Sequence, residues 1–410
     1  AYAELKTRLE EIDRTIDNPH NYLYYLATPP LLYGVIPRHL KAEGLNREGD
    51  GFRRIVVEKP FGYDLSSALE LNRIYLDAFR EEQIYRIDHF LGKETVQNIL
   101  ALRFANSVFE PLWNRNYIDY VEITAVENMG IGTRGGFYDG VGTLRDMVQN
   151  HLAQLLAVTA MEPPAAFDAS GFRNEVVKVY QSLTPLTGED IRHSVVRGQY
   201  MASEGRKGYR EEEQVPALSR TETYLAMRLE LNNWRWGGVP FYIRTGKQMP
   251  TKVSEIVIHF KPAPYSLFRC EGGTCPVPNR LVIRIQPNEG IVLRLGMKKP
   301  GEGFEVLPMD MDFSYAELGR LPTEDAYARL IEDCIAGDPT LFIRSDAVES
   351  GWRFFDPILK YWQDVPECPL YGYPAGSWGP LEADSLVARQ GASWTNPCKN
   401  LTNTHLYCEL

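Results

Sequence analysis

The sequence lacks the features that mark nucleic-acid-binding and membrane proteins. Its formal net charge is −10, whereas binding to a phosphate backbone requires a basic surface. No apolar run reaches the length of a membrane span, and the first residues do not form a secretion signal. We therefore expect a cytoplasmic protein with neither a nucleic-acid nor a membrane partner, although a small anionic ligand could still bind in a local basic pocket.

Cysteine is scarce, with six residues among 410, which is not the density of a disulfide-stabilised scaffold. Cys270 and Cys275 form a C-x4-C pair within a loop-like sequence. Two loop thiols are the first interpretation of this pair, a disulfide the second and a metal site the third, because two further ligands are not nearby. The sequence also has no HExxH or EF-hand motif, so no metal site is expected.

The glycine motifs of phosphate binding are absent as well. No G-x-G-x-x-G, G-x-x-G-D or P-loop pattern occurs in the chain. The glycine-rich stretch GIGTRGGFYDGVG, residues 130–142, lacks the strand-to-helix spacing of such a loop. It is interpreted as a flexible connection.

The first part of the chain alternates between strand and helix patterns. Hydrophobic residues make up 44% of the sequence and charged residues 24%, as in globular proteins, and 410 residues are too many for one ordinary core. Apolar runs at 21–30 and 52–60 end at prolines and predict strands buried on both faces. Helices are predicted at 3–17, 31–43 and 65–80. Asp64 would be the N-cap of the third helix. This alternation is typical of an α/β domain.

The rest of the chain predicts an α+β domain. Helices are expected at 93–105, 143–161, 323–336 and 345–362. Between them, alternating segments such as SEIVIHF predict an antiparallel sheet with one face covered. The predicted strands are 118–127, 194–202, 222–232, 240–245, 253–260, 280–286 and 290–298.

Lys59 and Pro60 form the first candidate site, at the end of the second apolar run. The residue before a proline is restricted to an extended backbone, so Lys59 would be presented stiffly. Ligands of open α/β sheets bind at the carboxyl ends of the strands. A solvated lysine in a strand-ending turn explains the same residues equally well.

A second candidate lies in the segment RIDHFLGKE. His89 and Lys93 flank a glycine just before a predicted helix, whose N-terminus favours an anion. This arrangement favours a phosphate site over the alternative of a capped helix start with surface charges. Asp88 would repel a phosphate, so we expect it to point elsewhere, to orient a second histidine.

His151 is the third candidate, at the edge of the apolar face of the helix predicted at 143–161. A lone histidine there is more often a hydrogen-bonded core residue, and this interpretation leads on the residues alone. The functional alternative is a general base tuned by a carboxylate. Asp146 also has a local explanation, because Thr143 and Asp146 have the spacing of a capping box.

Several charged or polar residues follow or end predicted strands. Taken singly they are weak evidence, because such residues are common at strand ends. They are Glu127, Lys247, Lys252, Arg284 and Gln286.

Several segments, taken in order, closely resemble the glucose-6-phosphate dehydrogenase family. They are IVVEKPFG, YRIDHFLGKETVQN, RFAN, GFYDGVGTLRDMVQNHLAQLLA, VPFYIRTGK and NRLVIRIQPNEG. The resemblance implies that residues 1–88 are the C-terminal part of a Rossmann-type NADP-binding domain. Residues 89–410 would then form a large antiparallel-sheet α+β domain for substrate binding and oligomerisation.

The resemblance also implies a reaction. The family oxidises C1 of glucose 6-phosphate to 6-phosphogluconolactone and passes the hydride to NADP+, the first step of the oxidative pentose phosphate pathway. His151 matches the family's general base. Asp88 matches the carboxylate that orients and charge-stabilises it, which explains why Asp88 stands beside a phosphate site.

Other family positions match residues of the candidate sites. His89 and Lys93 match the ligands of the substrate phosphate, and Lys59, with Pro60 beside it, matches the lysine between substrate and nicotinamide. Further matches bind sugar hydroxyls or phosphate: Glu127, Asp146, Lys247, Lys252 and, as an additional contact, Gln286.

The sequence departs from the family at two of these positions. Phe90 stands where the family often has tyrosine, which removes a hydroxyl on the phosphate side. Lys252 stands where some members have arginine, which keeps the charge but not the planar fork.

The resemblance further suggests a second, structural NADP+ molecule and an oligomer. Arg244, Arg284 and Arg294 lie where some members bind the structural NADP+, although the match is partial. Family members are dimers or tetramers built through the large sheet, so we expect a homodimer or homotetramer.

The family begins with a strand and a G-x-x-G-D-L-A loop that holds the cofactor diphosphate, and this sequence has neither. We therefore interpret the chain as a truncated form that binds the cofactor poorly by itself. An alternative is a non-catalytic truncated paralogue that serves as a sugar-phosphate-binding or structural subunit. A third is a related sugar-phosphate dehydrogenase that acts on another hexose, or on hexose 6-phosphate in another compartment.

The resemblance predicts the effect of one substitution. His151→Asn should abolish turnover and leave glucose 6-phosphate binding largely intact, because the base is lost but the phosphate ligands remain. Steady-state rates combined with a direct binding measurement test this. Loss of binding with unchanged turnover of the remaining complex would refute His151 as the base.

Overall fold

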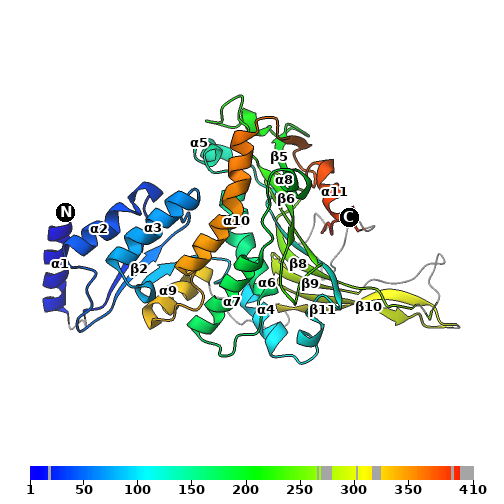
Figure 1. Ribbon diagram of the computed structural model, residues 1–410, viewed down its shortest axis with the longest axis horizontal. Helices are drawn as coiled ribbons and strands as arrows, with labels where there is room; N and C mark the ends of the chain where they lie inside the picture. Colours follow the sequence, from blue (N-terminus) through cyan, green and yellow to red (C-terminus); the bar gives the residue numbers. More distant parts are fainter. Residues whose placement is uncertain are drawn as a thin grey trace. The chain divides into compact units, whose positions relative to one another are not determined.

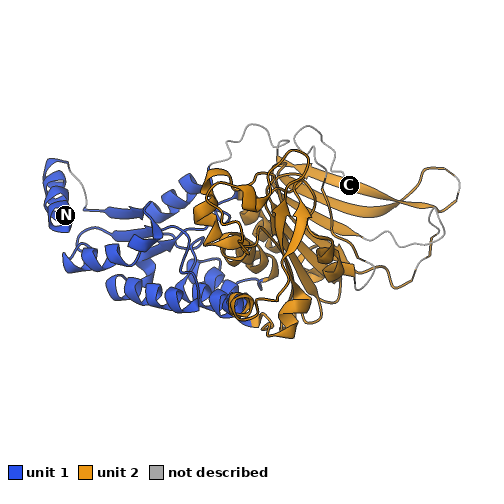
Figure 2. Cartoon of the chain, turned by 90° about the horizontal axis from the view of Figure 1, so that it is seen from above, with its two compact units in different colours: residues 1–93, 161–181, 324–356 blue, residues 94–160, 182–323, 357–410 orange. Residues whose placement is uncertain are grey.

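The computed structural model describes residues 1–16, 20–265, 267–268, 279–301, 303–315, 325–388 and 392–397. The Cys270/Cys275 loop and residues 398–410 lie outside the described residues. Figure 1 shows the helices and strands, and Figure 2 colours the two compact units into which the chain divides. Unit 1 comprises Ala1–Lys93, Met161–Gln181 and Glu324–Asp356, and unit 2 comprises the remaining segments.

A parallel three-stranded sheet forms the centre of unit 1. Its strands lie in the order β1 (Tyr22–Leu26), β2 (Arg53–Val57) and β3 (Ile84–Arg86). The register aligns Leu26 with Val57 and Val57 with Arg86. The carboxyl ends of the three strands therefore meet at one edge, as expected for an open α/β sheet.

Helices from three separate stretches of sequence complete unit 1. They are α1 (Tyr2–Thr15), α2 (Val35–Ala42), α3 (Leu65–Ala78), α7 (Ala169–Ser182), α9 (Ala326–Ala336) and the first part of α10 (Ser345–Asp364). Asp64 caps α3 as predicted, by accepting a hydrogen bond from the Ser67 N–H group at 2.7 Å.

Long-range hydrogen bonds tie the later helices to the start of the chain. Arg54 donates to the carbonyl of Cys334 at the end of α9, at 2.7 Å. The Trp352 indole of α10 is fully buried and donates to the Phe61 carbonyl at 2.9 Å. The units thus differ from the single boundary after residue 88 expected from the sequence, because α7, α9 and α10 supply apolar faces to the first unit.

Unit 2 is built on a nine-stranded sheet in the order β11-β10-β9-β8-β4-β7-β6-β5-β12. Most neighbours are antiparallel, but β4 pairs in parallel with β7, and β5 with β12. The sheet is therefore mixed and not purely antiparallel. Its strands are β4 (Ile118–Val126), β5 (Val195–Met201), β6 (Tyr224–Glu230), β7 (Pro240–Gly246), β8 (Val253–Phe260), β9 (Arg280–Gln286), β10 (Gly290–Lys298), β11 (Val306–Ser314) and β12 (Tyr371–Pro374).

Parts of the central strands alternate between apolar and polar side chains, yet both of their faces are buried. In β4, Val121 and Ile123 alternate with Glu122 and Thr124, and all four side chains are buried. On the polar face, the segment 392–397 contributes Thr395, whose N–H group donates to Glu122 at 2.9 Å. The expectation of only one covered face is therefore wrong at the centre of the sheet.

The helices of unit 2 include a continuous buried pair, η5 (Leu144–Leu152) and α6 (Ala153–Ala160). Three large side chains satisfy the carbonyl groups at the end of α6, where a helix leaves acceptors unpaired. Arg103 donates to Thr159 at 3.1 Å, Trp113 donates to the same carbonyl at 2.7 Å, and Trp236 donates to Ala160 at 2.8 Å. The other helices are α4 (Glu94–Phe104), α5 (Gly135–Asp139), α8 (Glu189–Ser194) and α11 (Asp384–Val387).

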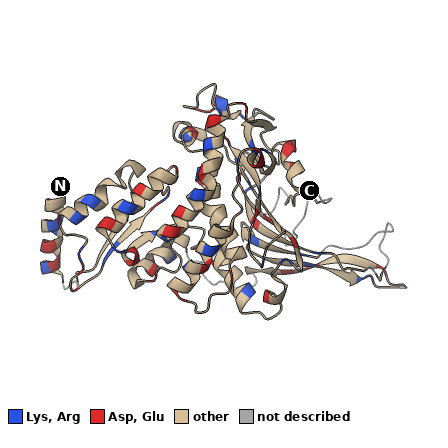
Figure 3. Ribbon diagram, viewed as in Figure 1, with Lys and Arg blue, Asp and Glu red and all other residues tan. Residues whose placement is uncertain are grey.

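Single-turn 3-10 helices complete the described secondary structure. They are η1 (Pro30–Leu32), η2 (Glu81–Gln83), η3 (Glu110–Leu112), η4 (Gly132–Arg134), η6 (Tyr209–Glu211) and η8 (Leu381–Ala383). Acidic and basic residues are interspersed along helices such as α1 and α10 (Figure 3). Within the described ranges, no helix is both long enough and apolar enough to cross a membrane.

Candidate active site

The carboxyl edge of the unit 1 sheet presents the first group of predicted residues. Lys59 and Pro60 follow β2 and are joined by a cis peptide bond. Gly62 fixes the exit of the chain, because its φ is +88° and a Cβ atom there would lie 2.7 Å from the Ala68 backbone nitrogen. The structure thus places Lys59 at the sheet edge where the sequence predicted it.

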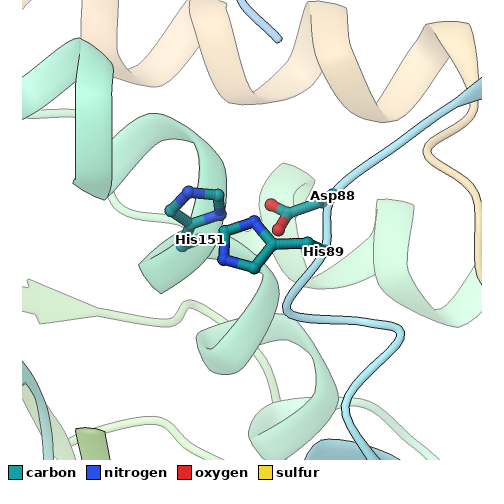
Figure 4. A group of neighbouring side chains, drawn as sticks. All are labelled: Asp88, His89 and His151. Atoms are coloured by element: carbon teal, nitrogen blue, oxygen red, sulfur yellow. The ribbon is translucent and has the colours of Figure 1, made fainter. Parts of the chain in front are cut away.

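Asp88 and His89 follow β3 at the same edge (Figure 4). Asp88 is 2% exposed, and its Oδ1 atom accepts a hydrogen bond from the Phe90 N–H group at 3.0 Å. The pKa of Tyr180 in α7 lies well above its usual range, because of burial first and of the Asp88 charge second. A buried carboxylate at this position suits the role of orienting a cationic or proton-accepting partner.

Phe90 supports the two predicted phosphate ligands. The His89 ring meets the Phe90 ring edge-on with centroids 5.0 Å apart, and the Lys93 ammonium lies 4.2 Å from the Phe90 centroid. Tyr327 of α9 stacks on His89 with a centroid separation of 6.0 Å and an interplanar angle of 5°. Sequence analysis missed Tyr327, which lies more than two hundred residues away, and nothing in its local sequence indicates this contact.

His151 lies in η5, within unit 2, and is 2% exposed (Figure 4). The prediction of one α-helix over 143–161 is wrong for its first half, because η5 is a π-helix and only α6 is α-helical. π-Helical hydrogen bonds join residues i and i+5, so side chains five positions apart share a face. Asp146 and His151 are five positions apart and therefore point from the same side of η5.

The start of η5 also differs from the prediction. Thr143 and Asp146 form no capping box, since Thr143 caps no backbone N–H group. Its hydroxyl instead donates to the Glu222 carbonyl at 2.9 Å and shares a 2.7 Å hydrogen bond with the Tyr138 hydroxyl. The Asp146 carboxylate lies instead 3.5 Å from the Lys247 ammonium.

The glycine-rich segment 130–142 is a packed structure and not a flexible connection. It contains η4 and α5. Asp139 accepts hydrogen bonds from the Tyr209 hydroxyl at 2.9 Å and the Ser219 hydroxyl at 2.5 Å. The Thr221 hydroxyl donates to the Asp139 carbonyl at 2.7 Å. The glycines permit close approach of neighbouring chain segments, as expected when a missing Cβ makes room for them.

Lys247 forms the centre of a charged cluster in unit 2. Its ammonium pairs with Glu127 and lies 3.5 Å from the Asp146 carboxylate. The Tyr138 ring centroid is 5.5 Å away. The parallel pairing of β4 and β7 brings Glu127 and Lys247 together, because the Glu127 N–H group donates to the Gly246 carbonyl at 2.9 Å. Three residues predicted from separate motifs thus form one ion-paired group.

Lys252 and Gln286 lie at neighbouring strand ends. Lys252 is exposed and precedes β8, whose first residue, Val253, pairs with Val126 at the end of β4. Gln286 ends β9 and donates to the Ser254 hydroxyl at 3.1 Å. Both therefore belong to the same end of the sheet as Glu127, although their side chains are more open than that of Lys247.

The three arginines considered for a second NADP+ are placed differently. Arg244 of β7 is buried and donates to the Thr395 carbonyl at 2.9 Å, with the Trp394 ring centroid 4.6 Å from its guanidinium. Arg284 of β9 pairs with Asp312, and Arg294 of β10 binds Asp310 through two hydrogen bonds of 2.7 and 2.8 Å. Acceptors of the chain thus pair with part of each guanidinium group, and a second NADP+ at these three arginines stays a prediction.

Comparison with known proteins covers nearly the whole chain. One family model, described as the C-terminal domain of glucose-6-phosphate dehydrogenase, matches residues 100–395, and a second, described as the NAD binding domain, matches residues 1–98. The chain belongs to the glucose-6-phosphate dehydrogenase family. The family predicted from the sequence motifs is thereby confirmed.

Individual members of the glucose-6-phosphate dehydrogenase family support the same assignment. Glucose-6-phosphate 1-dehydrogenase of Aggregatibacter actinomycetemcomitans is 54% identical over 97% of this chain and 80% of that protein. The enzyme of the same name from Treponema pallidum is 49% identical over 100% of this chain and 80% of that protein.

Two solved structures of the glucose-6-phosphate dehydrogenase family share the fold. A structure of glucose-6-phosphate dehydrogenase in complex with its substrate glucose-6-phosphate aligns with a TM-score of 0.88 and 35% identity, over 96% of this chain and 80% of that one. Glucose-6-phosphate 1-dehydrogenase from Mycobacterium avium aligns with a TM-score of 0.79 and 38% identity, over 95% and 80%. The predicted fold class, a Rossmann-type part followed by a large-sheet α+β part, is confirmed.

The Lys247 cluster predicts a stability effect. Lys247→Met should lower the free energy of unfolding by roughly 2 kcal/mol, because two carboxylates would lose their shared cation. This is less than the ~3–5 kcal/mol cost of breaking a fully buried pair, since Glu127 and Asp146 are partly exposed. Urea unfolding monitored by tryptophan fluorescence measures the change.

Lys252→Met is the matched control, because Lys252 is exposed at the same end of the sheet. It should leave stability within ~0.5 kcal/mol of the unsubstituted protein. Equal stabilities for both variants would show that the Lys247 ion pairs contribute nothing measurable. Adding Glu127→Gln to Lys247→Met should recover part of the loss.

Proposed function

We propose that this chain carries the active site of an enzyme that oxidises D-glucose 6-phosphate to 6-phospho-D-glucono-1,5-lactone with NADP+, the first step of the oxidative pentose phosphate pathway. The observation that carries the proposal is the match to relatives named glucose-6-phosphate 1-dehydrogenase, at 49–54% identity over almost the full chain. A family structure whose title names glucose-6-phosphate as its substrate supports the substrate class.

The chemistry requires a base and a hydride acceptor. The C1–H bond breaks with its electron pair, while the O1–H proton leaves and the C1–O1 double bond of the lactone forms. NADP+, when bound, supplies the acceptor for the hydride. In the proposal, His151 takes the O1 proton at a ring nitrogen, and the buried Asp88 carboxylate orients the ring and stabilises its positive charge.

The remaining residues hold the sugar phosphate. In the proposal, His89 and Lys93 donate hydrogen bonds to the phosphate, and the contacts of both side chains with the Phe90 ring support that role. The Lys247 cluster, with Glu127 and Asp146, offers both donors and acceptors, which is what a set of sugar hydroxyls requires. Lys252 and Gln286 extend this polar end of the sheet.

The cofactor side of the proposal rests on the carboxyl edge of the unit 1 sheet. A parallel sheet with its strand ends aligned fits a dinucleotide, because such ligands bind beyond those ends. Lys59 and Pro60 stand on that edge after β2, and we propose that they contact the nicotinamide end. The match of residues 1–98 to a model described as NAD binding supports this placement.

Turnover tests the proposal directly. The full-length gene product should form NADPH from glucose 6-phosphate and NADP+, followed by absorbance at 340 nm. Parallel assays with NAD+, with galactose 6-phosphate and with free glucose define the cofactor and the sugar. Folded protein that binds glucose 6-phosphate without oxidising it would favour the binding-subunit alternative, and preference for another sugar phosphate would favour a related dehydrogenase.

We further propose a cytoplasmic homodimer or homotetramer that forms through the large sheet. The strand β11 supports this, because it is an edge strand with an exposed apolar row. Met309, Met311 and Phe313 alternate along it and are 54%, 65% and 39% exposed. An apolar edge strand is a ready surface for association.

The apolar row makes the oligomer testable. Met311→Glu should lower the mass measured by light scattering toward that of a monomer, because a charge would be buried in the interface. Lys298→Glu, on the neighbouring strand β10 outside the apolar row, is the control and should leave the mass unchanged. A monomeric mass for the unsubstituted protein would contradict the proposed oligomer.

A further inference from the structure

The first turn of η5 is held by a residue from outside the helix. A helix start leaves N–H groups without partners inside the helix, and the N-cap residue Thr143 provides no side-chain cap. Glu222, just before β6, supplies the acceptors instead. Its Oε1 atom accepts from the Leu144 N–H group at 3.0 Å, and its main-chain carbonyl accepts from the Thr143 N–H group at 3.2 Å.

Gly142 makes this approach feasible. Its φ is +74°, and a Cβ atom at this position would lie 2.5 Å from Glu222 Oε1 and 2.9 Å from the carboxyl carbon. Only glycine both tolerates this backbone conformation and leaves room for the carboxyl group. The Glu222 side chain itself is buried, with 6% exposure. The hydrogen bond between Glu222 and the start of η5 therefore lies in the closely packed interior and not on the surface.

Glu222 occupies this place at an energetic cost. Burial raises the pKa of its carboxyl group, whereas the hydrogen bond from Leu144 and the positive charges of Arg197 and Arg145 lower it. The positive end of the helix dipole favours a carboxylate at this point. An apolar side chain could fill the same space without the cost of burying a carboxyl group. We therefore infer that this position requires a hydrogen-bond acceptor for the Leu144 N–H group.

The same two-residue segment also positions Lys247. Thr223 follows Glu222, and its carbonyl accepts from the Lys247 N–H group at 2.9 Å. The Lys247 carbonyl in turn accepts from the buried Tyr373 hydroxyl at 2.7 Å. Glu222 and Thr223 thus join the start of η5 to the backbone of Lys247, which sets the 3.5 Å approach of Lys247 to Asp146.

We propose that Glu222 is a positioning residue that fixes the first turn of η5, so that Asp146 and His151 face the sugar in register with Lys247. The inference rests on the proposed function for the roles of Asp146 and His151. Glu222 touches neither substrate nor cofactor in this account and acts only through η5.

Two substitutions separate the acceptor from the charge. Glu222→Gln keeps a carbonyl oxygen for the Leu144 N–H group, so kcat/KM should stay within about threefold of the unsubstituted enzyme. Glu222→Ala removes the acceptor, and displacement of η5 should lower kcat/KM by about 10- to 100-fold through both a higher KM for glucose 6-phosphate and a lower kcat. Glu230→Ala, at the other end of β6, is the matched control and should change neither constant.

Hydrogen exchange provides a readout that does not depend on activity. Mass spectrometry should show faster exchange of the amides between residues 143 and 151 in Glu222→Ala but not in Glu222→Gln. Because this measurement needs no turnover, it tests the anchor even if the unsubstituted enzyme fails to oxidise glucose 6-phosphate. That failure would sink the proposed function and leave the structural part of the inference standing.

The outcomes discriminate a positioning role from a purely structural one. A structural role predicts lower thermal stability in Glu222→Ala with normal KM and kcat at a temperature where the variant is folded, and that result overturns the proposal. So does equal impairment of Glu222→Gln and Glu222→Ala. If Glu222→Ala does not fold, Gly142→Ala replaces it, since the added methyl group displaces the carboxyl group and should reproduce the same kinetic loss.

Discussion

The parallel pairing of β4 with β7 is the interaction on which the large-sheet unit depends. β4 is the middle strand of the nine, flanked by β8 and β7, and its register with β7 decides which residues leave the sheet together. Glu127 and Lys247 emerge side by side only because Val126 lies opposite Gly246. A shift of one residue would turn every side chain of the strand to the opposite face and would separate the two charges.

The π-helix adds a second constraint of the same kind. An α-helix would turn Asp146 and His151 away from each other, since its same-face neighbours are three or four positions apart. The wider π-helical turn places residues five apart on one side. The helix then continues as α6, whose end is fixed by Arg103, Trp113 and Trp236. Side chains from elsewhere in unit 2 therefore bind both ends of the continuous helix η5–α6, with Glu222 at its start.

Local sequence patterns predicted much of the fold. The strands β4 to β10 and the helices α3, α9 and α10 lie close to the ranges predicted for them, because apolar side chains recur regularly along each of these segments. The patterns missed β11 and β12, whose sequences VLPMDMDFS and YGYP contain proline and lack a continuous β-branched run. They also missed the parallel pairing, since the partner of a strand depends on chain crossovers that local periodicity does not encode.

The candidate site likewise contains residues that local motifs predicted and residues that only the packing reveals. Asp88, His89, Lys93, His151 and Lys247 stand in compact motifs, and the structure places each at the strand end or helix where the motif predicted it. Glu222 and Tyr327 were missed because their roles arise only when distant segments pack. The glycine segment at 130–142, expected to be a flexible connection, is packed for the same reason: its glycines make room for Glu222 and for the loop that carries Tyr209 and Ser219.

The division of unit 1 among three stretches of sequence has a consequence for the order of synthesis. The strands β1, β2 and β3 have all been made by residue 86, but α7, α9 and the start of α10 follow much later. Trp352 cannot reach the Phe61 carbonyl until most of unit 2 has left the ribosome. The apolar surface of the β1–β3 sheet therefore remains incompletely covered while most strands of the larger sheet are being translated. The packing of unit 1 can therefore be completed only after nearly the whole chain has been synthesised, and not when residues 1–93 alone have been made.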